Sequence, residues 1–133
     1  MYDILRKNSA LSKEEFYQCC VENEAVDASL NKFSLLLHHS VQLRIQNTPA
    51  YCNECIKKQK ECKHSKIAVL FSGGIDCTIL ALIANTYADP DDSIDLLNVA
   101  FEQVNKTDAV WDVPDRLTAK ESLTELQHLC PKR

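Results

Sequence analysis

The feature that most limits how this chain can fold is a pair of glycines, Gly73 and Gly74, directly after a run of apolar residues. They are the only glycines among 133 residues. The apolar run, residues 66–71, predicts a strand buried on both faces of a parallel sheet. Residues 76–87 carry isoleucines and leucines at helical spacing, which predicts a helix packed on that sheet. Glycine tolerates the positive φ values of a tight strand-to-helix turn, so both glycines fit this connection.

A second strand is predicted after this helix, over residues 94–101. The acidic turn at residues 89–92 ends the helix, and strand, helix and strand in this order predict a right-handed βαβ unit with two parallel strands. After a polar loop, Asp115 or Thr118 is expected to cap a last helix, which carries leucines at helical spacing before Pro131. The predicted fold class is therefore α/β, with a partial parallel sheet preceded by helices.

The sequence of the N-terminal part of the chain predicts helices and no strand. Residues 1–26 form a helical segment, in which Ser12 and Glu15 have the spacing of a capping box. Residues 28–46 repeat apolar side chains at helical spacing and predict a packing helix. We expect the main domain to cover residues 27–133.

Composition and charge exclude several classes of protein. Apolar residues make up 45% and charged residues 26% of the chain, as in ordinary globular proteins. No apolar stretch approaches the roughly 18 residues of a membrane span, and no apolar signal core follows Met1, so we expect a cytoplasmic protein. The net charge is −4. Acidic residues dominate residues 67–133, which makes nucleic acid an unlikely partner.

The turn around the glycines has the chemistry of a phosphate site. A strand that ends in Ser72-Gly73-Gly74 and opens a helix near Asp76 aims several backbone N–H groups at one point, where a phosphate is stabilised. Asp76 could hold Mg²⁺ against the phosphates. The alternative is a simple turn with Asp76 as an N-cap. The Gly-rich patterns of Walker A loops and of dinucleotide-binding folds are absent from the sequence.

The segment Ser72-Gly73-Gly74-Ile75-Asp76-Cys77 resembles the PP-loop of ATP pyrophosphatases, whose pattern is Ser-Gly-Gly-x-Asp-Ser. The resemblance implies an adenine nucleotide alpha hydrolase-like fold, in which this loop holds the phosphates of ATP with Mg²⁺. The last position departs from the pattern. Cys77 stands where the family has a serine, and a thiol is a weaker hydrogen-bond partner than a hydroxyl, so a weaker hold on pyrophosphate is expected.

Within this superfamily, residues 95–101 and 113–127 resemble the asparagine synthetase domain, in particular that of the asparagine synthetase domain-containing type. The resemblance covers about residues 27–133. It implies that Phe71 and Val99 flank the adenosine, while Ser72, Gly73, Gly74, Asp76 and Cys77 contact the phosphates or their Mg²⁺.

The chemistry implied by the resemblance is asparagine biosynthesis from aspartate, glutamine and ATP. A family glutaminase domain begins with a nucleophilic cysteine after the initiator Met, where this chain has Tyr2. The family's second nucleotide-facing loop would lie beyond Arg133. We therefore expect a partial domain that is incomplete for catalysis on its own, with its catalytic residues unknown. Its activity would depend on a protein partner or on a missing C-terminal half.

A second group of candidate residues lies in a Cys- and Lys-rich insert at residues 51–66. Three thiols and one imidazole, from Cys52, Cys55, Cys62 and His64, match the number and softness of ligands in a tetrahedral zinc site. The separation of Cys62 and His64 is tighter than in usual zinc motifs, and five lysines lie in the same insert. From sequence alone, unligated thiols in a solvated basic loop are favoured over zinc.

Two other functions stay open at this point. PP-loop enzymes that thiolate transfer RNA can carry zinc-binding cysteines, and the lysines of the insert could meet phosphates. A non-catalytic interaction module built on an ATP-binding fold would also account for Cys77.

Overall fold

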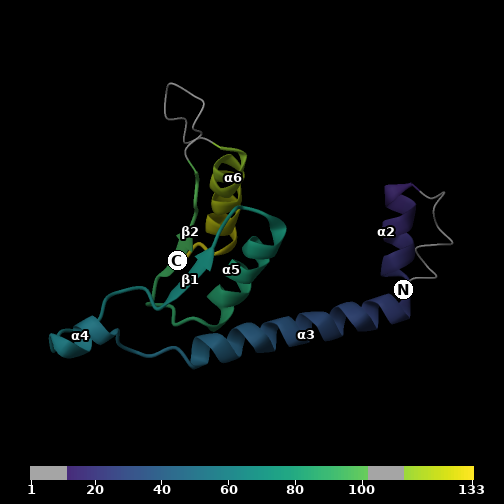
Figure 1. Ribbon diagram of the computed structural model, residues 1–133. Helices are drawn as coiled ribbons and strands as arrows, with labels where there is room; N and C mark the ends of the chain where they lie inside the picture. Colours follow the sequence, from purple (N-terminus) through teal and green to yellow (C-terminus); the bar gives the residue numbers. More distant parts are fainter. Residues whose placement is uncertain (1–11, 102–112) are drawn as a thin grey trace, which may run out of the picture. The chain divides into compact units, whose positions relative to one another are not determined.

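The computed structural model describes residues 12–101 and 113–133 (Figure 1). In this part of the chain there are five helices and two strands, so the predicted α/β class is confirmed. The chain divides into two compact units, residues 1–40 and residues 41–133. None of the helices in the described ranges is long and apolar enough to cross a membrane.

The first unit contains helix α2, Lys13–Val21, and most of helix α3, Glu24–Gln46. The predicted capping box is present at the start of α2. The Ser12 backbone N–H donates to the Glu15 carboxylate over 2.9 Å, and the Glu15 N–H donates to the Ser12 hydroxyl over 3.3 Å. Neither helix has a buried residue, so α2 and α3 are held mainly by bonds between residues close in sequence.

The second unit is built on a two-stranded parallel sheet (Figure 1). Strand β1, Ile67–Leu70, pairs with strand β2, Ile94–Leu97, and Ile67 lies opposite Ile94. Helix α5, Ile75–Tyr87, connects the two strands as predicted. Phe71 extends the pairing, because its N–H donates to the carbonyl of Leu97 over 2.7 Å.

One face of the sheet carries the core. Helices α5 and α6, Pro114–Leu129, contribute the buried Ala81, Ala119 and Leu126, which pack with Phe71. On the other face, the side chains are open, and Leu70 is 75% exposed. The prediction of a strand buried on both faces was therefore wrong for β1, whose residues alternate between half-buried and exposed. The apolar run resembles a fully buried strand, but in the described residues helices cover only one face.

Helix α6 begins differently from the prediction. Its N-cap is Val113, without a side-chain hydrogen bond, and Pro114 occupies the first turn. Asp115 and Thr118 thus lie inside the helix rather than at its cap, and the Thr118 hydroxyl donates to the Pro114 carbonyl. Proline is favoured at this position because its missing N–H has no helical acceptor there. The polar loop expected before α6 lies largely outside the described residues.

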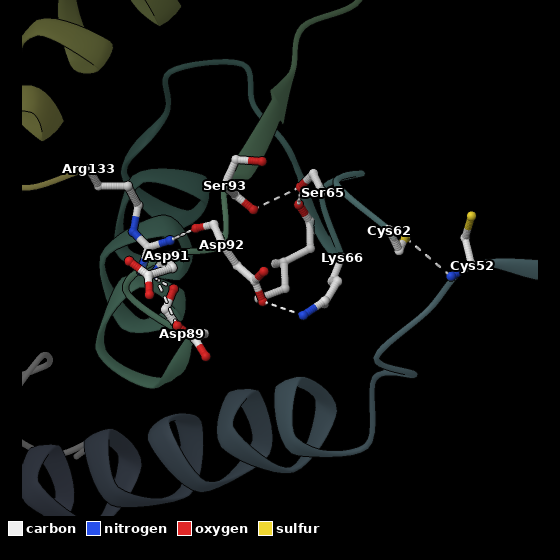
Figure 2. A network of polar contacts seen from close by, with 10 residues as sticks. Cys52, Cys62, Ser65, Lys66, Asp89, Asp91, Asp92, Ser93 and Arg133 are labelled. Atoms are coloured by element: carbon white, nitrogen blue, oxygen red, sulfur yellow. Dashed lines mark hydrogen bonds and ion pairs between the residues drawn. The ribbon is translucent and has the colours of Figure 1, made fainter. Parts of the chain in front are cut away.

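A network of polar contacts lies where the two strands of the sheet begin (Figure 2). The Lys66 ammonium lies 2.8 Å from the carboxylate of Asp92, and the Ser65 hydroxyl donates to the Ser93 carbonyl over 2.9 Å. The Arg133 guanidinium donates to the carbonyls of Asp89 and Asp92. The bonds of Ser65 and Lys66 join the residues before β1 to the turn before β2, and those of Arg133 join residue 133 to the same turn. That turn is the one predicted at residues 89–92, and the Asp91 N–H donates to the Asp89 carboxylate.

Candidate functional site

The loop between β1 and α5 is shaped by close contact with α6. Gly73 is buried and has a φ of +85°, a conformation that other residues adopt only with strain. A Cβ atom at Gly73 would lie 2.4 Å from the backbone of both Thr118 and Ala119. The Ser122 hydroxyl donates to the Gly73 carbonyl over 2.7 Å. Glycine is therefore required at position 73 by packing as well as by conformation.

The other end of the loop opens helix α5. Gly74 is the N-cap residue, and the first-turn N–H groups of Ile75, Asp76 and Cys77 have no acceptor within the helix because no earlier helical turn exists. These groups carry the positive end of the helix dipole. Asp76 is exposed in the same turn. The loop thus offers N–H donors and a carboxylate side by side.

The Cys77 thiol turns toward the backbone of the loop. It donates to the Gly74 carbonyl over 3.0 Å and lies 3.8 Å from the Ser72 hydroxyl. Burial acts to raise the pKa of this thiol, but hydrogen bonds with the Ser72 hydroxyl and with the backbone of Gly73 and Ser72 leave the pKa below its usual value. Cys77 is therefore part of the loop's own hydrogen bonding.

The residues predicted to flank the adenosine lie at the same edge of the sheet, but in different environments. Phe71 is 3% exposed and its side chain belongs to the core, whereas Val99 is 61% exposed. Any contact of Phe71 with a ligand would thus come mainly from its backbone. A depression of ≈ 260 Å³ follows this edge, lined by Leu70, Phe71, Ser72, Leu97, Asn98 and Val99.

Sequence reasoning missed a long-range tether of this edge. The Asn98 amide donates to the Phe71 carbonyl over 2.9 Å, and the Arg116 guanidinium donates to the Asn98 side-chain oxygen over 3.3 Å. These bonds join the carboxyl ends of both strands to α6. The available signal was the register: a polar residue directly after a strand of a parallel sheet lies beside the end of the neighbouring strand.

The four ligand candidates of the insert come together in the structure. The Nδ1 atom of His64 lies 3.4 Å from the Sγ of Cys52, 3.5 Å from that of Cys55 and 3.7 Å from that of Cys62. All four atoms lie within 4.8 Å of one another. The insert is not only a loop, because it contains the short helix α4, Asn53–Lys57, of which Cys52 is the N-cap.

The thiols of this cluster differ in acidity. Hydrogen bonds from the backbone of Cys52 and His64 lower the pKa of Cys62 to about 6. A hydrogen bond with Cys52, together with burial, raises the pKa of Cys55 to about 12. The backbone N–H of Cys55 lowers the pKa of Cys52, and contact with Cys62 raises that of His64. The protein's own groups thus favour the thiolate form of Cys62 and oppose that of Cys55.

Comparison with known proteins identifies relatives of this chain. No family model matches it, and no solved structure does. The asparagine synthetase domain-containing protein CG17486 of Drosophila melanogaster is 40% identical over 88% of this chain. The mouse asparagine synthetase domain-containing protein 1 is 29% identical over 95% of it. The yeast asparagine synthetase domain-containing protein YML096W is 40% identical over 65% of it.

The alignments with the fly and mouse proteins each cover most of this chain. The chain spans only 22% of the length of the fly protein and 25% of that of the mouse protein. The chain is therefore a homologue of part of the asparagine synthetase domain-containing proteins.

Proposed function

We propose that this chain carries the pyrophosphate-holding part of an asparagine-synthetase-like, ATP-binding PP-loop domain. The observation that carries the proposal is the position of the loop Ser72–Cys77, at the carboxyl end of β1 and the N-terminus of α5. In open α/β sheets, ligands bind outside the carboxyl ends of the strands. The names of the relatives support an asparagine-synthetase type over other users of such a loop.

In this proposal the loop residues have separate roles. The N–H groups of Ile75, Asp76 and Cys77 donate to the phosphate oxygens of ATP, whose negative charge the helix dipole favours. Asp76 carries the exposed carboxylate that would hold Mg²⁺ beside those phosphates. Gly73 keeps the loop against α6, so the donors are fixed before ATP arrives.

The adenosine would lie along the depression that includes Ser72 and Val99. Its ≈ 260 Å³ lies below the roughly 300–1,000 Å³ of usual ligand pockets. The depression therefore fits part of a nucleotide, which agrees with a chain that spans about a quarter of its relatives. The remaining contacts would come from the rest of the domain or from a partner protein.

The reaction proposed for the whole domain is the conversion of aspartate to asparagine in the cytoplasm. The aspartate side-chain carboxylate attacks the α-phosphorus of ATP, pyrophosphate leaves, and ammonia released from glutamine then displaces AMP. The loop of this chain would stabilise the departing pyrophosphate, whose negative charge grows as the bond breaks. A family role in tRNA thiolation is less well supported, because the named relatives are synthetase-like.

The experiment is binding of Mg-ATP and of Mg-pyrophosphate to the purified chain, measured by calorimetry and by thermal unfolding. A ligand at about 100 times its Kd stabilises the folded state by about 2.7 kcal/mol. Asp76→Asn keeps the size of the side chain and removes its charge, so it should weaken binding of both magnesium complexes. Asp95→Asn is the matched control, because Asp95 is exposed on the open face of β2 and lies away from the loop.

A Cys77→Ser variant tests the effect of the thiol on binding. It restores the hydroxyl of the PP-loop pattern and should bind pyrophosphate more tightly than the natural chain, since a hydroxyl is the stronger hydrogen-bond partner. If neither ligand binds to the folded natural chain or to Cys77→Ser, the ATP proposal fails and a non-catalytic interaction module takes its place.

A further inference from the structure

The four side chains of the insert approach the geometry of a tetrahedral metal site. With Zn–S bonds of about 2.3 Å and Zn–N bonds of about 2.0–2.1 Å, a regular tetrahedron places sulfur and nitrogen about 3.6 Å apart. The three observed distances from His64 Nδ1 to the sulfurs of Cys52, Cys55 and Cys62 are 3.4, 3.5 and 3.7 Å. All three edges that meet at the nitrogen therefore have the length that one zinc ion would require.

The backbone around the sulfurs is arranged as expected for metal-bound thiolates. The Cys55 N–H points at the Cys52 sulfur over 3.4 Å, and the Cys52 N–H points at the Cys62 sulfur over 3.5 Å, the contact drawn in Figure 2. Donors of this kind orient the ligands of a metal and stabilise their negative charge. The sulfurs of Cys52 and Cys62 thus each accept a hydrogen bond from a backbone N–H.

A strained turn brings the third cysteine back to the first two. After α4 the Lys60 N–H donates to the Cys55 carbonyl and the Gln59 N–H to that of Ile56, which is the Schellman arrangement. Glycine normally occupies the left-handed position of this turn, but here it is Gln59, with a φ of +48°. A residue with a Cβ costs about 1–2 kcal/mol in this conformation. Something in the insert must offset that cost.

Apolar packing does not offset it. None of the residues of the described core cluster comes from the insert. Cys55 is the buried residue of α4, at 8% exposure, and Ile56 beside it is 59% exposed. A helix of five residues is not stable by itself in water. Ordering each residue of the insert costs about 1–2 kcal/mol in backbone entropy. A cross-link between the sulfurs and the imidazole is the remaining candidate for what holds the fold of the insert.

We propose that Cys52, Cys55, Cys62 and His64 together bind one structural zinc ion. Three thiolates and an imidazole suit zinc, a borderline-soft cation without a redox role. Four protein ligands close the coordination sphere, so the site has no position for substrate. The ion links α4 to His64, just before β1. Ser65, next to His64, is bonded to Ser93 at the start of β2, so the linked segment is itself attached to the sheet. The inference does not depend on the loop at residues 72–77 binding ATP.

The first test is the zinc content of the full chain, purified under a reducing agent that does not bind metals. We expect about one zinc per chain. Cys62→Ser and His64→Ala should each lose most of it. The double variant Cys19→Ser, Cys20→Ser removes two thiols of α2 and is the matched control, which should keep the full content.

Two further measurements separate loss of a ligand from loss of folding. His64→Cys supplies a fourth sulfur and should keep the zinc that His64→Ala loses. Replacing zinc by Co²⁺ should give the intense visible bands of tetrahedral cobalt in the natural chain. In His64→Cys the sulfur-to-cobalt absorption should become stronger.

Three results would overturn the proposal. The natural chain could contain almost no zinc and give only the weak spectrum of solvated cobalt. The zinc content could be the same in Cys62→Ser as in the natural chain. Intact mass under the same reducing conditions could be two hydrogens lower than the sequence requires, with the missing thiols mapped to Cys52, Cys55 or Cys62, which would show a disulfide in place of metal ligands.

Discussion

The two candidate sites of this chain are held in opposite ways. The glycine loop is fixed by contacts between residues far apart in sequence: α6 closes on Gly73, and Ser122 bonds its carbonyl. The cysteine–histidine cluster is assembled from residues within a span of 13 positions, between Cys52 and His64, with sulfur and nitrogen at its centre. The first site depends on the whole α/β unit. The second depends mainly on its own four side chains.

Because of this difference, each site can lose its structure while the other keeps it. A change in packing should disturb the loop and leave the cluster able to bind metal. A change in metal should disturb the insert and leave the sheet intact, because none of the four proposed ligands takes part in the pairing of β1 with β2 or in the described core cluster.

Removal of metal should have the largest local effect. Structural zinc contributes on the order of 10 kcal/mol to the folding of small zinc domains. A strong zinc chelator should therefore abolish the amide-exchange protection of Ile56, Lys58 and Lys60, whose N–H groups bond within α4 and its turn. Protection in α5 should change little. Equal loss of protection in both segments, measured by mass spectrometry, would show that the two regions are not independent.

Gly73→Ala should have the next largest effect, on the other region. The new Cβ would clash with the α6 backbone at 2.4 Å and would also force a non-glycine residue into a φ of +85°. Overpacking costs about 1–3 kcal/mol and the left-handed conformation about 1–2 kcal/mol, so a loss of about 3 kcal/mol is expected in urea unfolding. The zinc content should stay unchanged.

Gly74→Ala is the matched control for this experiment. A Cβ at Gly74 would meet only the Ser72 hydroxyl, at 3.6 Å, and its φ of −66° suits any residue. The loss should be below about 1 kcal/mol, the usual cost of placing alanine at an N-cap. Equal losses in the two variants would mean that α6 does not press on the loop at Gly73.

The elements of the packed region could largely be predicted from sequence, because hydrophobic periodicity is a local signal. The prediction of strand, glycine turn, helix and strand is confirmed, with β2 ending at Leu97 rather than at position 101. The burial of β1 and the cap of α6 were predicted wrongly. Burial depends on what covers a face, and the cap depends on Pro114, which begins the helix before Asp115.

The candidate sites were predictable to different degrees. The loop residues form one continuous motif, so their proximity follows from chain order. The cluster needs a reversal at Gln59, where no glycine or asparagine signals the left-handed turn. Spacing alone could not show that His64 returns to Cys52. The tether of Asn98 to Arg116 crosses 18 positions and likewise has no local signal.

Asn98→Ala should have a moderate effect on the packed region. It leaves the Phe71 carbonyl without the amide donor and removes the oxygen to which Arg116 donates. Loss of such a partner at a partly buried site costs about 1–3 kcal/mol in unfolding free energy. Asn31→Ala, which removes an exposed bond to Asp27 in α3, is the control and should cost much less. If both variants unfold at the same urea concentration, the tether does not stabilise the sheet edge.

The smallest effect is expected at the capping box of α2, which like the cluster is held by neighbours in sequence but has no metal to strengthen it. Hydrogen bonds from the backbone and hydroxyl of Ser12 hold the pKa of Glu15 below its usual value of 4.5. A lowered pKa means that the stabilising contribution is present above pH 4.5 and is lost as the pH falls through the folded-state value.

An NMR titration of the Glu15 carboxyl should therefore give a midpoint below 4.5. In Ser12→Ala, which removes only the hydroxyl, the midpoint should move part of the way back, because the backbone bond is the larger cause. A midpoint that does not respond to Ser12→Ala would show that the hydroxyl does not stabilise the Glu15 carboxylate and that the backbone N–H of Ser12 alone lowers its pKa.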